Sequence, residues 1–119
     1  MSQSELEVLK QDGVTVIVLG AQYDNLDESA LEAVTNELLE IVQQSEPALI
    51  VVDMSRTKFF GSAFLGALFR VWRRITTRKG KLAMCGATGL CAEVLDVTQV
   101  NRLWNLYMTR DEAINSLNS

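Results

Sequence analysis

A serine at the start of an expected helix is the residue of this chain best placed to do chemistry. Ser62 follows Gly61 and precedes apolar residues spaced three or four positions apart, a pattern typical of an amphipathic helix. We expect Ser62 to be the N-cap, where a hydroxyl accepts a hydrogen bond from a free amide of the first turn. The helix dipole favours negative charge there, so the hydroxyl is a candidate phosphorylation site. A plain N-cap without regulation is the alternative.

The remaining residues offer little for catalysis. The chain has no histidine, which excludes Ser-His-Asp and Cys-His nucleophiles and histidine metal sites. We expect Asp24, Asp53 and Asp96 to be isolated carboxylates, whereas general acid–base catalysis needs positioned partners. The Gly-Ala-Thr-Gly segment at 86–89 lacks nucleotide-binding spacing, so we expect a structural turn with Thr88 as an N-cap. The sequence therefore predicts a protein that is not an enzyme and that binds no metal or cofactor.

Composition limits the compartment and the partners. The length of 119 residues suits a single domain over 1–119. Cys85 and Cys91 form no C-x-x-C pattern, and we expect both to be packed, reduced thiols in a cytoplasmic protein. We expect no secretory leader and no membrane span, because no apolar run approaches the roughly 20 residues that cross a bilayer. The net charge of −4 opposes general binding to nucleic acid.

The elements expected around Ser62 alternate between strands and helices. An apolar, β-branched run at 48–53 predicts a buried strand that ends at Asp53. The helix that starts at Ser62 runs to about Arg78 and is ended by Lys79-Gly80. The other expected elements are strands at 5–10, 14–19, 82–85 and 102–107, and helices from 27 to the break at 46–47, at 90–97 and at 109–117. A turn at 11–13 joins the first two strands into a hairpin.

Local signals mark the starts of two of these helices. Asp27 is expected to N-cap the first helix, with Leu26 and Leu31 at the staple positions. Thr109 and Glu112 have capping-box spacing at the last helix. Strands that alternate with helices imply parallel strand pairs joined by right-handed crossovers. The predicted fold class is α/β, a mixed sheet of about five strands with helices, in the order β-β-α-β-α-β-α-β-α.

The segment around Ser62 resembles the central motif of the STAS domain, the fold of bacterial anti-sigma factor antagonists. In that family a strand ends in Asp, and a Phe precedes an Asp-Ser-Ser-Gly-Leu-Gly-like helix start whose first Ser is phosphorylated by a partner kinase. The matching residues are Asp53, Ser55, Phe59, Ser62, Leu65 and Gly66. The motif's Asp, second Ser and first Gly are replaced by Gly61, Ala63 and Phe64. The element order is also that of the family, so the resemblance covers nearly the whole chain.

The resemblance implies a phosphorylation-regulated binding module. Such a protein, while unphosphorylated, captures an anti-sigma factor that is also a serine kinase, and so frees a sigma factor for transcription; a serine phosphatase reverses the modification. Phosphate on Ser62 would disfavour the complex. The alternative is an unphosphorylated STAS scaffold in a multi-protein signalling assembly. A small enzyme or a flavodoxin-like nucleotide-binding domain is a third class, which would require a site that the sequence does not show. A weak homodimer is left open.

The expected partner surface surrounds the start of the Ser62 helix. Small side chains there let a partner approach the backbone closely, and Phe64 could supply an apolar anchor; core packing is the alternative for Phe64. Asp24 lies in the loop where the family often has an Asp. The expected partner-binding residues are Ala63, Phe64, Gly66, Ala67, Arg70 and Asp24.

Basic residues gather towards the end of the same helix. Six of the eleven fall between Arg70 and Lys81: Arg70, Arg73, Arg74, Arg78, Lys79 and Lys81. We expect a solvated helix end, where cations complement the dipole. A surface for an acidic partner or for anionic lipid is the alternative, and high salt would weaken it.

Overall fold

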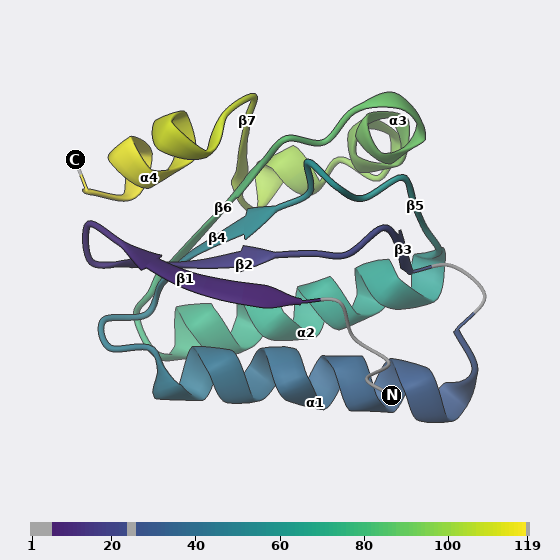
Figure 1. The fold of residues 1–119 in the computed structure, drawn as a ribbon, viewed down its shortest axis with the longest axis horizontal. Coiled ribbons are helices and arrows are strands. Elements are labelled where there is room, and N and C mark those ends of the chain that lie inside the picture. The colour runs from purple at the N-terminus through teal and green to yellow at the C-terminus, as the bar shows by residue number, and fades with distance from the viewer. Residues whose placement is uncertain (1–5, 24–25, 119) are drawn as a thin grey trace.

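A five-stranded mixed sheet lies at the centre of the computed structural model, which describes residues 6–23 and 26–118 (Figure 1). Its strand order is β1-β2-β4-β6-β7. The strands are β1 (Glu7–Gln11), β2 (Val14–Val18), β4 (Leu49–Asp53), β6 (Lys81–Cys85) and β7 (Asn105–Tyr107). The first two pair antiparallel and the other pairs are parallel, which confirms the predicted hairpin and the α/β fold class.

Helices cover both faces of this sheet (Figure 1). On one face α1 (Glu28–Gln44) and α2 (Ser62–Thr77) lie side by side, and on the other lies α4 (Arg110–Asn118). The helix α3 (Gly89–Val97) and the 3-10 helix η1 (Val100–Arg102) connect β6 to β7. The central strands are therefore buried on both sides, which explains why β2 and β4 are almost wholly apolar.

Two hydrophobic clusters result, one on each face. The larger lies between the sheet and the pair α1–α2, and it includes Leu38, Ile50 and Phe64. The smaller joins Val51 and other small apolar sheet residues to Ala113, Ile114 and Leu117 of α4. Burial of apolar area on both faces is the main force that holds the layers together.

The local signals at the ends of elements behave largely as the sequence predicts. The Asp27 carboxylate accepts a hydrogen bond from the Ala30 amide at 2.7 Å, so Asp27 is the N-cap of α1. Thr109 and Glu112 form the reciprocal capping box of α4, with both hydrogen bonds at 3.2 Å. After α2, a Cβ built on Gly80 would lie 2.1 Å from the Ala48 carbonyl oxygen, so glycine is required there.

Two parts of the chain depart from the prediction. The last strand covers only Asn105–Tyr107, because the end of η1 and the turn after it occupy 102–104 of the predicted 102–107 strand. A second, two-stranded sheet pairs β3 (Gln22–Tyr23) with β5 (Phe59–Phe60) in parallel. Strands of two residues carry no periodic pattern, so the sequence offered no signal for this small sheet.

Candidate functional site

Ser62 lies exposed at the first residue of α2 and is not its N-cap, which corrects the prediction. Gly61 takes that role, with the extended backbone (φ −99°, ψ 173°) that an N-cap adopts. The Gly61 carbonyl accepts the first helical hydrogen bond, from the Leu65 amide at 3.1 Å. No side chain caps α2 and its first turn holds no acidic residue, so the free amides there suit an anion.

The loop before Ser62 is held in place by hydrogen bonds to the loop after β2. The Gly61 amide donates to the Tyr23 carbonyl at 3.2 Å, and the Lys58 amide donates to the Ala21 carbonyl at 2.8 Å. These contacts extend the short β3–β5 pairing in both directions, and the Gly61 contact reaches the start of α2. The start of α2 therefore has a fixed position relative to the main sheet.

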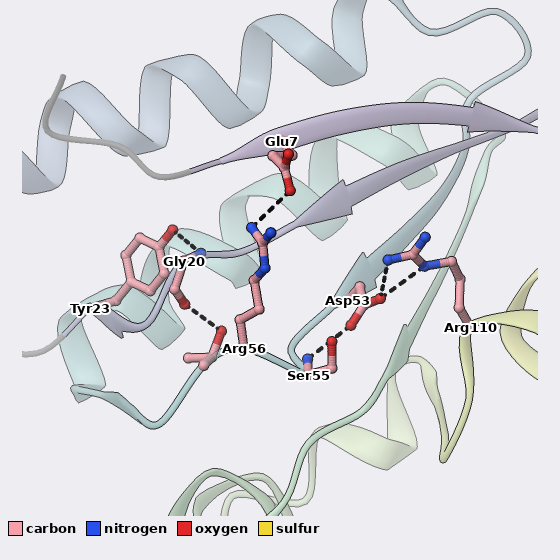
Figure 2. Close-up of polar contacts among 8 residues, drawn as sticks. Glu7, Gly20, Tyr23, Asp53, Ser55, Arg56 and Arg110 are labelled. Atoms are coloured by element: carbon pink, nitrogen blue, oxygen red, sulfur yellow. Dashed lines mark hydrogen bonds and ion pairs between the residues drawn. The ribbon is translucent and has the colours of Figure 1, made fainter.

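Gly20 is bonded on both sides of its backbone (Figure 2). Its amide donates to the Tyr23 hydroxyl at 2.7 Å, and its carbonyl accepts from the Thr57 hydroxyl at 2.8 Å. Because these groups are buried, each hydrogen bond satisfies a polar atom that water cannot reach. The contacts join the loop after β2 to the loop that leads to Ser62.

Phe64 belongs to the core and not to the partner surface, which corrects its assignment as a docking anchor. Its side chain is 0% exposed, and its ring stacks on Tyr23 with the centroids 4.3 Å apart. The physical reason is its position on α2, where it faces the sheet together with Leu65 and Leu68. Phe64 therefore anchors α2 to the loop that carries β3, which is the alternative that the sequence left open.

A groove lies between the first halves of α1 and α2. Its volume is about 350 Å³, and its α2 side is made by Ala63, Gly66, Ala67 and Arg70. Four of the predicted partner-binding residues thus line one surface. A Cβ on Gly66 would meet no atom within 4 Å, so the backbone of α2 is open to an approaching molecule here. Asp24, the remaining predicted residue, lies outside the described residues.

The α1 side of the groove was missed by sequence reasoning. It consists of Glu28, Leu31, Glu32 and Thr35. These residues are far from Ser62 in the chain and reach it only because both helices pack on the same face of the sheet. Glu28 and Glu32 are exposed and one helical turn apart, and they give the groove an acidic rim.

Asp53 is paired, which corrects its interpretation as an isolated carboxylate (Figure 2). Its Oδ2 accepts from Arg110 Nε at 2.9 Å and from Nη2 at 2.8 Å, and its Oδ1 accepts from the Ser55 amide at 2.8 Å. Burial by itself raises the pKa of the carboxyl, but the hydrogen bonds from Ser55 and the Arg110 charge outweigh it and lower the pKa below its ordinary value. Asp96, by contrast, is exposed on α3.

Cys85 and Cys91 are buried and unpaired, as predicted. Burial, the largest effect, together with the nearby Asp53 carboxylate raises the pKa of the Cys85 thiol to about 12. Burial also raises the pKa of Cys91. Both sulfurs therefore stay protonated at neutral pH and are poor nucleophiles.

The backbone of the turn at 86–89 depends on its two glycines. Gly86 (φ 78°) and Gly89 (φ 55°) adopt the left-handed region that favours glycine. Thr88 is the N-cap of α3, as predicted, although its side chain makes no cap hydrogen bond. Gly86 also packs against Ser55, since a Cβ there would lie 2.9 Å from the Ser55 amide nitrogen.

The basic run divides into two parts. Arg78 binds the end of α1: its guanidinium donates to the carbonyls of Val42, Gln43 and Ser45 and to the Glu46 carboxylate. Arg70, Arg73 and Arg74 are exposed and border a shallow depression of about 230 Å³ with Thr77. Arg78 thus stabilises a helix C-terminus, whereas the other three arginines face solvent.

Within 6–23 and 26–118, no three metal-ligating side chains of the His, Cys, Asp or Glu type come together. In the same ranges no helix combines the length and the apolar character that a membrane span requires.

Comparison with known proteins gives consistent matches over most of the chain. A family model described as the STAS domain matches residues 5–113. An anti-sigma F factor antagonist from Paenibacillus polymyxa is 22% identical over 113 residues, which are 95% of this chain and 92% of that protein. The solved structure of an anti-sigma-factor antagonist (STAS) domain protein from Planctomyces limnophilus superposes with a TM-score of 0.83 at 33% identity, over 96% of this chain and 98% of the other.

A further solved structure is that of the Bacillus cell fate determinant SpoIIAA in its phosphorylated form. It has a TM-score of 0.69 and 17% identity, over 93% of this chain and 97% of the other. At that identity the likeness shows the fold alone.

Proposed function

This chain belongs to the STAS domain family, a family of non-enzymatic domains, and we propose that it is a phosphorylation-regulated binding protein of the anti-sigma factor antagonist type. In this role the unphosphorylated chain binds an anti-sigma factor with serine kinase activity in the bacterial cytoplasm, and so permits transcription by a sigma factor. One observation carries the proposal: Ser62 is exposed in the first turn of α2, directly beside the groove that Ala63 and Gly66 line.

The position of Ser62 suits a phosphate. A phosphoserine carries close to two negative charges at neutral pH, and the first turn of a helix offers free amides and the positive end of the dipole. Because no acidic residue lies in the first turn of α2, nothing within that turn opposes the added charge. The modification would therefore be tolerated by the fold.

The same phosphate would change the charge of the surface that a partner contacts. Ala63 follows Ser62 directly and lines the groove, so a phosphate places negative charge next to an edge that already carries Glu28 and Glu32. A partner that fits the unphosphorylated groove would lose affinity through repulsion and through the cost of desolvating the phosphate. A serine phosphatase would restore binding. The Bacillus cell fate determinant SpoIIAA, which shares the fold, has been solved in a phosphorylated form.

The departures from the family motif favour one second candidate. Gly61 replaces the motif's Asp, and Phe64, in place of its first Gly, is committed to the core. A STAS scaffold in a multi-protein signalling assembly would keep the groove and leave Ser62 unmodified. The two candidates differ in whether charge at Ser62 changes binding.

The test is a capture experiment from lysate of the native host with the wild-type chain and with Ser62→Asp. Asn115→Asp is the matched control, because it adds the same charge at an exposed position of α4 on the opposite face of the sheet. Bound proteins are identified by mass spectrometry. The proposal expects a serine kinase with the wild type and with Asn115→Asp, but not with Ser62→Asp. Equal recovery of the same partners by all three chains would instead support the scaffold.

A further inference from the structure

The α1–α2 layer carries exposed acidic side chains on α1 and exposed basic side chains on α2. Glu28 and Glu32 lie in the first half of α1, and Arg73 and Arg74 lie in the second half of α2. All four side chains are exposed, and none takes part in an ion pair with any residue that the structure describes. Four charges are thus available on one face of the molecule.

The two charge pairs are diagonal to each other on this face. The helices run side by side in the same direction (Figure 1), and the groove places Glu28 and Glu32 beside Ala63 and Gly66. Arg73 and Arg74 lie about two turns further along α2 than Ala63 and Gly66, which is roughly 11–14 Å at 1.5 Å per residue. The helix axes of a packed pair are about 8–10 Å apart, so the acidic pair and the basic pair occupy opposite corners of a rectangle.

We propose that this face binds a second copy of the same chain about a two-fold axis. An axis that lies in the plane of the face, near Thr35 and Arg70 and perpendicular to the diagonal that joins the two charge pairs, exchanges the two corners. It places Arg73 and Arg74 of each copy over Glu28 and Glu32 of the other. The contact is isologous, since both acid–base pairings are made by the same surface patch.

The shape of the face agrees with this pairing. Ala63 and Gly66 leave the groove shallow along α2, and an added Cβ at Gly66 would meet open space. The helices of a second copy could therefore approach closely before the charges meet. Few large apolar side chains are exposed here, because the exposed large apolar residues among 6–23 and 26–118 lie on other elements.

The association is accordingly weak and sensitive to salt. Each copy has a net charge of −4, so two copies repel at long range, and the opposed pairs attract only within the Debye length of about 10 Å. Exposed ion pairs contribute little individually, and four acid–arginine contacts act together in the dimer. The dimer also covers the groove. If the proposed function holds, self-association and partner binding therefore exclude each other, whereas the dimer itself does not depend on that function.

The experiment uses sedimentation equilibrium of the full chain at concentrations up to about 0.5 mM, the range of a weak dimer. One variant carries Glu28→Lys and Glu32→Lys, and a second carries Arg73→Glu and Arg74→Glu. Each is expected to be monomeric alone. When mixed, the two variants are expected to form a one-to-one heterodimer, because every contact between them pairs opposite charges. The wild-type dissociation constant should rise about tenfold or more between about 0.05 M and 0.5 M NaCl.

The control variant carries Glu93→Lys and Asp96→Lys, which make the same charge change at exposed positions of α3. It should dimerise at least as well as the wild type. Circular dichroism checks that every variant is folded, and Arg73→Gln with Arg74→Gln replaces the charge reversal should that one unfold. A wild-type chain that is monomeric throughout, or a dimer that the charge reversals leave intact, would overturn the proposal, and neither result bears on binding of an anti-sigma factor.

Discussion

The guanidinium of Arg110, at the start of α4, holds the carboxylate of Asp53, at the end of β4, through contacts of 2.9 and 2.8 Å. The two residues are 57 positions apart in the chain. Asp53 is 3% exposed, so its charge depends on this partner and on the Ser55 amide. The pair joins the helix on one face of the sheet to the strand that leads towards Ser62.

Removal of Arg110 should destabilise the protein. Arg110→Ala leaves the buried Asp53 carboxylate without its cation, and we expect the free energy of unfolding to fall by about 2 kcal/mol, less than for a fully buried pair because Arg110 is partly exposed. Urea unfolding measures the difference. Arg56→Ala is the matched control: its partner Glu7 is exposed (Figure 2), so that loss should stay below about 1 kcal/mol. Equal effects would contradict the structural role of Asp53.

The contribution of Asp53 should depend on pH. Its pKa is lowered in the folded protein, so its stabilisation is fully present above the unfolded-state pKa of about 3.9 and is lost as pH falls through the lower folded value. We expect the stability difference between wild type and Asp53→Asn to be constant from about pH 7 to pH 5 and to shrink below about pH 4. Urea unfolding at these pH values tests this, and parallel pH profiles would refute it.

Two glycines should respond to alanine in opposite directions. Gly80→Ala forces a Cβ to within 2.1 Å of the Ala48 carbonyl oxygen, so we expect a loss of at least about 2 kcal/mol in the free energy of unfolding. Gly66→Ala adds a Cβ in open space on a helix, where alanine is favoured by about 1 kcal/mol. Thermal unfolding of both variants shows whether each change lowers or raises the stability of the protein. A stable Gly80→Ala protein would mean that the end of α2 lies further from β4.

Tyr23→Phe tests the hydrogen bond between the Tyr23 hydroxyl and the Gly20 amide. The variant removes the hydroxyl that accepts the Gly20 amide at 2.7 Å and leaves a buried donor unsatisfied, at a cost of about 1–3 kcal/mol. Tyr107→Phe removes the same atom from a half-buried strand residue and should change stability by less than about 0.5 kcal/mol. Urea unfolding distinguishes the two. If Tyr23→Phe is as stable as Tyr107→Phe, the hydroxyl does not hold the loop.

Charge at Ser62 should alter the stability of α2 independently of any partner. Ser62→Asp places a carboxylate in a first turn that holds no acidic residue, so we expect a gain of about 0.3–1 kcal/mol from the helix dipole. Ser62→Lys should give a loss of similar size. Thermal unfolding at low salt measures both, and high salt should reduce both effects. If the two variants had identical stability, charge at position 62 would not interact with the dipole of α2.

Local sequence signals predicted most elements of the fold. The caps at Asp27 and Thr109 involve side chains within three positions of the amides they bind, so sequence spacing alone identifies them. The N-cap of α2 was misplaced by one residue, because the choice between Gly61 and Ser62 depends on backbone angles that spacing does not reveal. Helix boundaries are set by the surrounding chain, here by the β3–β5 pairing.

Sequence periodicity could predict the part of the candidate site that lies on α2, but not the parts that other helices contribute. Ala63, Gly66, Ala67 and Arg70 follow Ser62 on one helix and could be grouped by periodicity. Glu28 and Glu32 join them through tertiary packing of α1 against α2, and Arg110 reaches Asp53 through the placement of α4. An aromatic side chain such as Phe64 suits a docking surface as well as a core. Its position on the sheet-facing side of α2 places it in the core.

The placement of α4 on the face of the sheet opposite α1 and α2 has a practical consequence for biosensor work (Figure 1). A biotin handle attached after Asn118 would leave from the α4 side of the molecule. The immobilised chain would then present the groove and Ser62 to the flowing solution, and each tethered copy would keep both open to a captured analyte. A handle at the start of α1 would instead bring the sensor surface against the groove.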